Sequence, residues 1–169
     1  GEKNCTTPHL TEDQIKEAFV KAMNRLIAGK EKVIADSEFA RQFLTDTADP
    51  EKEQTELEQE IAVLVEMTQN TVAENARVAL DQKEYQERYN GLVDRYDRAK
   101  ARYEEVTDAI AAKKTRYKAL GTFIDRLREQ DVVTKFDAGL WGSMVKFMTV
   151  YSDNDIRVTF QNDVEVKAE

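Results

Sequence analysis

A heptad pattern in the second half of the chain is the strongest constraint on its fold. Apolar and aromatic residues recur there at alternating steps of four and three, interrupted only by Lys113. This spacing is typical of a coiled-coil seam, and at 1.5 Å per residue the seam is about 60 Å long. Its members are Tyr85, Tyr89, Leu92, Tyr96, Ala99, Tyr103, Val106, Ile110, Lys113, Tyr117, Leu120, Ile124 and Leu127.

The partner of this seam is expected in the preceding segment, which carries a weaker apolar stripe of Leu57, Ile61, Leu64 or Val65, Val72, Ala76 and Val78. The heptad register alone allows either one long helix over 51–127 that dimerises or two helices that fold back on each other. A hairpin is favoured because polar Thr68, Thr71, Asn75 and Gln82 would otherwise interrupt a continuous seam. A helix-start pattern also begins at Asp81. We therefore predict an antiparallel hairpin over 49–130, with its tip at about 75–81.

The segment before the hairpin is predicted to be helical over 11–48. Thr11 is placed as an N-cap, with Gln14 at the reciprocal capping-box position. A weak point is expected at Gly29 and a further break near Asp36 and Ser37. The hairpin itself should begin with Asp49 as the cap and Pro50 at the first helical position.

The last segment, 131–169, has a different pattern. A short helix should begin at Phe136 and Asp137, with Trp141 as a core anchor, and two strands, Phe147–Tyr151 and Ile156–Phe160, flank a polar turn. Val164 and Val166 could add a third strand. The predicted fold class is mainly α: a long antiparallel coiled-coil helical hairpin with an N-terminal helix and a small C-terminal β-hairpin.

Composition narrows the function classes. The chain has 169 residues, of which 34% are charged, and its net charge of −8 disfavours strong binding to nucleic acid by this segment alone. It has no apolar run of about 20 residues, so no membrane span is expected. The single cysteine fits a reducing cytoplasm. No catalytic constellation is visible, and because the first residue is Gly1 we expect a piece of a longer protein.

Cys5 and His9, the only cysteine and the only histidine, lie four positions apart. Structural zinc requires four ligands, so these two cannot form a site alone. Two interpretations stay open: they are incidental, or they are the last ligands of a zinc ribbon whose other cysteines lie upstream.

Three further groups are candidate contacts. The basic residues Lys113, Lys114, Arg116 and Lys118 could reach a DNA backbone or form an ordinary solvated face. The seam tyrosines could stack on bases, but packing in the seam is favoured. Apolar residues near the predicted tip could bind a protein partner or simply close the turn; they are Met67, Val72, Ala76, Val78, Leu80 and Tyr85.

Three stretches together resemble the C-terminal region of large serine recombinases, the integrase- and transposase-like enzymes of bacterial mobile elements. They are CTTPHLTEDQIKEAFVKAMNRL, DQKEYQERYNGLVDRYDRAKARYEEV and FDAGLWGSMVKFMTVYSDNDIRVTF. The resemblance covers nearly the whole chain in order. Its first and last stretches are the more specific, because heptads match many unrelated proteins. The terminal QNDVEV departs from the family pattern, which has a glycine in this turn.

The resemblance implies a parent protein with a catalytic serine domain, a DNA-binding domain and a zinc ribbon from which a coiled coil projects. Cys5 would be the final zinc ligand and His9 a less certain one; 1–10 would be the end of the ribbon. Partners would be other recombinase subunits through the tips, a directionality factor, and DNA through the parent, in a bacterial cytoplasm. The alternative is a free-standing coiled-coil scaffold with no DNA role.

Overall fold

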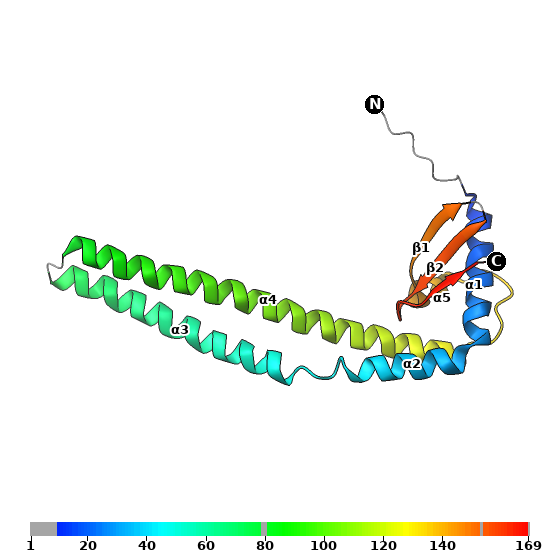
Figure 1. The fold of residues 1–169 in the computed structure, drawn as a ribbon, viewed down its shortest axis with the longest axis horizontal. Helices are drawn as coiled ribbons and strands as arrows, with labels where there is room; N and C mark the ends of the chain where they lie inside the picture. The colour runs from blue at the N-terminus through cyan, green and yellow to red at the C-terminus, as the bar shows by residue number, and fades with distance from the viewer. Residues whose placement is uncertain (1–9, 79–80, 153, 169) are drawn as a thin grey trace, which may run out of the picture. The chain divides into compact units, whose positions relative to one another are not determined.

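The computed structural model describes residues 10–78, 81–152 and 154–168, and these residues form two compact units. One unit is Asp46–Lys114, and the other combines the described residues up to Thr45 with those from Thr115 onward. Figure 1 shows the elements, which are α1 (Glu12–Ala28), α2 (Lys30–Gln42), α3 (Ala48–Arg77), α4 (Gln82–Glu129), α5 (Ala138–Met144), β1 (Val145–Ser152), β2 (Asp155–Phe160) and β3 (Glu165–Lys167). The predicted fold class is confirmed.

Helices α1 and α2 form as the local signals predict, except at one point. Thr11 caps α1: its Oγ1 accepts the Gln14 N–H at 3.2 Å, and Gln14 Oε1 accepts the Thr11 N–H at 2.8 Å. Gly29 separates the two helices. The break expected near Asp36 and Ser37 is wrong, because α2 continues through both residues and the buried Ser37 hydroxyl donates to the Val33 carbonyl at 2.7 Å.

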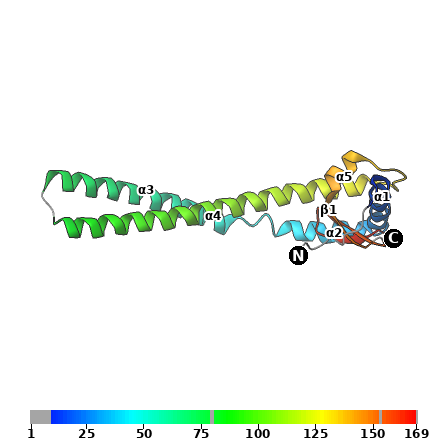
Figure 2. The ribbon, with the colours of Figure 1, turned by 90° about the horizontal axis from the view of Figure 1, so that it is seen from above.

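Helices α3 and α4 lie side by side as the predicted antiparallel hairpin, and the two views agree on this (Figures 1 and 2). The expected start was wrong by two residues: Thr47 is the N-cap and Pro50 is the third helical residue. Proline is tolerated there because the first four helical N–H groups have no partner within the helix. The second start is confirmed, since Asp81 Oδ1 accepts the N–H groups of Lys83 and Glu84 at 2.9 and 3.0 Å.

The hairpin buries a narrow apolar seam. Leu64 is 1% exposed and Val65 is 39% exposed, which assigns the seam position to Leu64. On the part of α4 within this unit, up to Lys114, the buried seam residues are Leu92, Ala99, Val106 and Ile110. Lys113, the interruption in the heptad pattern, is half-buried and donates from Nζ to the Asp46 carbonyl at 2.9 Å. The hairpin therefore has an apolar seam, but this seam buries few side chains.

The other unit has the larger core, which fills the space between α1, the last turns of α4, α5 and the sheet. Its buried residues include Phe19, Met23, Phe123, Leu127, Met144, Val158 and Phe160. Phe19 packs edge-on against Trp141 with ring centroids 5.4 Å apart. The side chain of Asn24 ties the loop after α4 to α1, donating to the Val133 carbonyl and accepting the Val133 N–H, both at 2.8 Å.

The sheet contains the expected third strand. Its order is β1-β2-β3, with both pairs antiparallel. In the turn before β3, Asp163 has φ of 65°, the left-handed region that glycine enters most readily and aspartate tolerates. Asp163 also forms ion pairs with Lys146 at 2.7 Å and with Arg116. The turn therefore forms without the glycine that the family pattern has there.

Candidate functional site

The hairpin has two flanks of opposite character, one on each side of its seam. On the first, three acidic residues of α3 pair with three arginines of α4: Glu53 with Arg102 at 2.7 Å, Glu60 with Arg95 at 3.2 Å and Glu74 with Arg88 at 3.3 Å. We call this the ion-paired flank. The hydrogen bond from Arg102 lowers the pKa of Glu53 below its ordinary value. Such exposed pairs add little stability each, but they favour one alignment of the two helices.

On the opposite flank, the residues between Lys83 and Asp97 of α4 and those facing them on α3 carry no charge. It consists of Ala62, Val65, Gln69, Val72 and Ala76 on α3 and Gln86, Asn90 and Val93 on α4, and we call it the uncharged flank. A hollow of about 200 Å³ opens in it, lined by Val65, Thr68, Gln69, Val93 and Tyr96. Positions that flank a two-stranded seam are commonly charged. Exposed valines at these positions therefore indicate a surface for contact with another protein segment.

The predicted tip residues do not form one patch. Met67 and Val72 are five residues apart on α3 and so lie on opposite flanks. Val78 is 58% exposed in the turn after α3, and Ala76 is exposed on the last turn of that helix. Tyr85 lies half-buried on the seam beside Tyr89, with ring centroids 6.0 Å apart. Leu80 lies outside the described residues.

A second hollow, of about 150 Å³, lies close to the turn on the ion-paired flank. Its lining residues are mostly acidic and polar: Thr71, Glu74, Asp81, Glu84, Tyr85 and Arg88. The ion pair between Arg88 and Glu74 crosses this region. Near the turn, charged residues therefore line the ion-paired flank, whereas the uncharged flank presents Val72, Ala76 and Gln86.

Sequence reasoning missed Val65 and Val93 as candidate contact residues. Their signal was present, because each directly follows a buried seam residue, Leu64 or Leu92, and so occupies the same flank. Choosing residues by hydrophobicity near the turn grouped side chains that point in different directions.

Three of the four basic candidates for DNA contact are engaged within their own unit. Lys113 donates to the Asp46 carbonyl, Lys114 pairs with Glu51 at 2.9 Å, and Arg116 pairs with Asp163. Lys118 is exposed on the next turn of α4. Hydrogen bonding to Lys114 lowers the pKa of Glu51. A phosphate would have to compete with these partners for three of the four side chains.

Cys5 and His9 lie outside the described residues. Within the described ranges, 10–78, 81–152 and 154–168, no cluster of three or more His, Cys, Asp or Glu residues could hold a metal ion. None of the helices in these ranges is long and apolar enough to cross a membrane.

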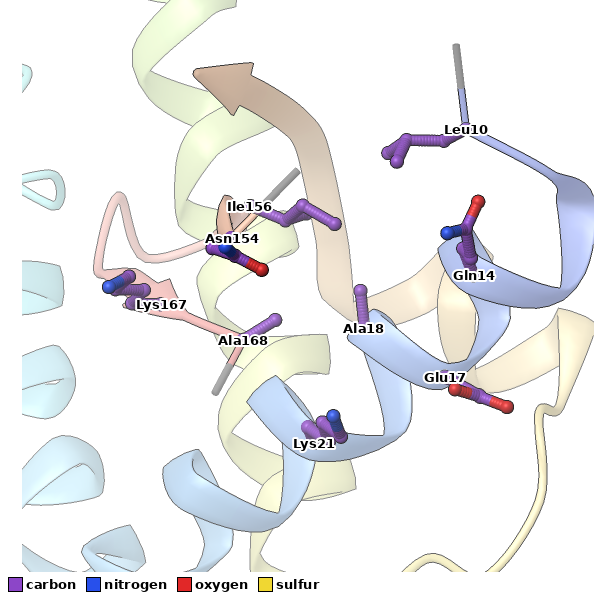
Figure 3. A pocket seen from close by; sticks show the side chains of 9 residues that line it. All are labelled: Leu10, Gln14, Glu17, Ala18, Lys21, Asn154, Ile156, Lys167 and Ala168. Atoms are coloured by element: carbon purple, nitrogen blue, oxygen red, sulfur yellow. The ribbon is translucent and has the colours of Figure 1, made fainter. Parts of the chain in front are cut away.

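The other unit contains an open hollow of about 430 Å³ between α1 and the sheet. Figure 3 shows its lining side chains, which come from α1 on one side and from β2, β3 and the residues next to them on the other: Leu10, Gln14, Glu17, Ala18, Lys21, Asn154, Ile156, Lys167 and Ala168. These described residues combine one carboxylate, two ammonium groups and two amides with an apolar floor. These described lining residues include no serine, cysteine or histidine.

Comparisons of the chain with protein-family models, with curated proteins and with solved structures found no match. Any assignment of function therefore rests on the residues and on the geometry of the hairpin.

Proposed function

We propose that this chain is the C-terminal coiled-coil module of a site-specific serine recombinase from a mobile genetic element. In this role it mediates contacts between recombinase subunits while the parent enzyme integrates or excises DNA. The observation that supports the proposal is the antiparallel hairpin, in which α3 ends at Arg77 and α4 begins at Gln82. The three sequence stretches that resemble the family coincide with α1, with the first part of α4, and with α5, β1 and β2.

In this proposal, this chain and the rest of the parent protein have different roles. DNA cleavage belongs to an upstream serine domain, and zinc is held by an upstream ribbon that ends with Cys5 and in which His9 is a secondary candidate. The net charge of −8 suits a segment that contacts protein rather than phosphate. Subunits bound at two DNA sites would contact each other through the distal hairpin, and a directionality factor would act by changing that contact.

Zinc content tests the identity of the parent. The chain extended by its natural upstream sequence should bind about one zinc per chain, and Cys5→Ser should abolish stable binding. A free-standing scaffold would bind none, with or without Cys5. Metal analysis of the purified extended protein distinguishes the two, and absence of zinc would refute the recombinase assignment.

Val78→Asp tests the subunit contact in the full-length parent. Val78 is exposed at the turn, so an aspartate there should leave folding intact and weaken the pairing of two DNA-bound subunits. The matched control is Ala101→Asp, which makes the same charge change on an exposed position of α4 farther from the turn. Electrophoretic analysis of paired complexes should show loss for Val78→Asp alone, with single-site DNA binding unchanged. Equal pairing by both variants would refute a role for the tip.

A further inference from the structure

The hollow between α1 and the sheet differs in charge from the chain as a whole. Most of the net charge of −8 belongs to the hairpin unit, Asp46–Lys114, which has 17 acidic and 10 basic residues. The lining of the hollow instead combines the single carboxylate of Glu17 with the ammonium groups of Lys21 and Lys167. An anion that approaches this hollow is therefore attracted locally, although the chain is acidic.

The capping box at the start of α1 orients one hydrogen-bond donor at the hollow. Gln14 Oε1 accepts the N–H of Thr11 at 2.8 Å, which fixes the two ends of the side-chain amide. Figure 3 shows the amide nitrogen of Gln14 on the side of the hollow, facing Ile156. Among residues 10–78, 81–152 and 154–168, this nitrogen has no hydrogen-bond acceptor.

Lys21 supplies a second donor on the same face of α1. It lies seven residues, or about two turns, after Gln14, and the small side chain of Ala18 lies between them. Within the described ranges the Lys21 ammonium group has neither an ion-pair partner nor a hydrogen-bond partner. Because the lysine stem is long and flexible, its ammonium group can reach across Ala18 toward the amide of Gln14.

The opposite wall adds apolar surface and one amide. Ile156, on β2, is 8% exposed, and Ala168 follows β3, so both contribute to the apolar floor together with Ala18. Asn154 lies at the edge of this wall. A hollow of about 430 Å³ with an apolar floor and a few polar groups has the size and the composition of a site for a small ligand.

We infer that this hollow binds a carboxylate attached to a short branched apolar group. One carboxylate oxygen accepts from the Lys21 ammonium group, the other accepts from the Gln14 amide, and the apolar group lies against Ile156 and Ala168. A monoanion fits better than a phosphate dianion, because the lining carries one net positive charge and includes Glu17. The carboxylate can belong to a free acid or to the C-terminus of a peptide that ends in an aliphatic residue. The inference does not rest on the proposed recombinase role, since it concerns only the unit without the coiled coil.

Nuclear magnetic resonance titration of the 169-residue chain with 4-methylpentanoate tests the inference. We expect saturable shifts of the Gln14 side-chain amide and of the backbone amides of Ala18 and Ile156, with a Kd of about 1 mM for so small a ligand. The neutral 4-methylpentanamide should cause much smaller shifts at these positions. The peptide acetyl-Gly-Gly-Leu, compared with its C-terminal amide, shows whether the site prefers a peptide terminus to a free acid.

Three variants separate a specific site from general attraction of anions. Lys21→Met should raise the Kd about 10-fold, because it removes the charged donor and keeps most of the stem. Glu17→Gln should lower the Kd about 2-fold, since it removes a competing carboxylate. Lys32→Met, at an exposed position of α2 away from the hollow, is the matched control and should leave the Kd unchanged. Dispersed amide spectra verify that each variant is folded. The inference is overturned if neither the acid nor the peptide binds, if the neutral amide binds equally well, or if Lys32→Met has the same effect as Lys21→Met.

Discussion

Asn24 gives the most direct test of how the larger core is held together. Its side chain makes two hydrogen bonds to the backbone of Val133, each 2.8 Å long, and these fix the loop between α4 and α5 against α1. Asn24→Ala removes both bonds and leaves the Val133 N–H and carbonyl without these partners in a partly buried setting. A hydrogen bond contributes about 1 kcal/mol net, and an unsatisfied buried group costs about 1–3 kcal/mol. We expect the free energy of unfolding to fall by about 2–3 kcal/mol.

The assay uses the only tryptophan of the chain as a local probe. Trp141 lies in the same unit as Asn24, where its ring contacts Phe19 and Phe136 with centroids 5.4 and 6.0 Å apart. Urea titration followed by tryptophan fluorescence therefore reports this unit even if the hairpin unfolds separately. The control is Asn70→Ala, an exposed position of α3 in the other unit, which should not move this transition. A change below about 0.5 kcal/mol for Asn24→Ala would refute the reasoning, because the loop would then be held by its apolar contacts alone.

Two further predictions concern the same unit. The hydrogen bond from Lys146 lowers the pKa of Asp163, so its stabilising effect is complete above the unfolded pKa and is lost as the pH falls through the folded pKa. Asp163→Asn should therefore lower the melting temperature at pH 7, with the difference vanishing between about pH 5 and pH 2; a pH-independent difference would contradict this. Gly121→Ala should fail to give the usual gain of about 0.5–1 kcal/mol, because the new Cβ would lie 2.9 Å from Nη2 of Arg41, whose guanidinium stacks on Tyr117. The gain should return in an Arg41→Ala background, and a full gain with Arg41 present would show that the side chain moves aside freely.

The features that the sequence predicted correctly are those with local causes. The heptad seam and the caps at Thr11 and Asp81 depend on residues within one or two turns of each other. The hairpin could be distinguished from a single long helix because the polar residues of the seam and a new helix start coincide at the turn.

The errors arose where long-range contacts decide. Ser37 resembled a helix break, yet its hydroxyl donates to Val33 and also accepts from the amide of Asn162, more than a hundred residues away. The close packing at Gly121 could not be predicted from the local sequence, because the side chain that lies against it, Arg41, comes from a different helix. For the candidate site, the residue types near the turn were visible in the sequence. The sequence did not show which of these residues lie on which flank. That assignment depends on the burial of Leu64, rather than Val65, in the seam.

The distal part of the hairpin should be its least stable part. Among residues 65–78 and 81–91, no apolar side chain is buried; Thr71 is the buried residue, and its hydroxyl donates to the Met67 carbonyl. Toward the base, α4 buries Leu92, Ala99, Val106 and Ile110. Local opening requires less free energy where fewer apolar contacts are lost.

Hydrogen exchange followed by mass spectrometry should therefore show faster amide exchange over 66–78 and 81–89 than over 92–110. Uniform protection along the hairpin in the monomer would show that its ion pairs stabilise the distal part as well as the apolar seam stabilises the base.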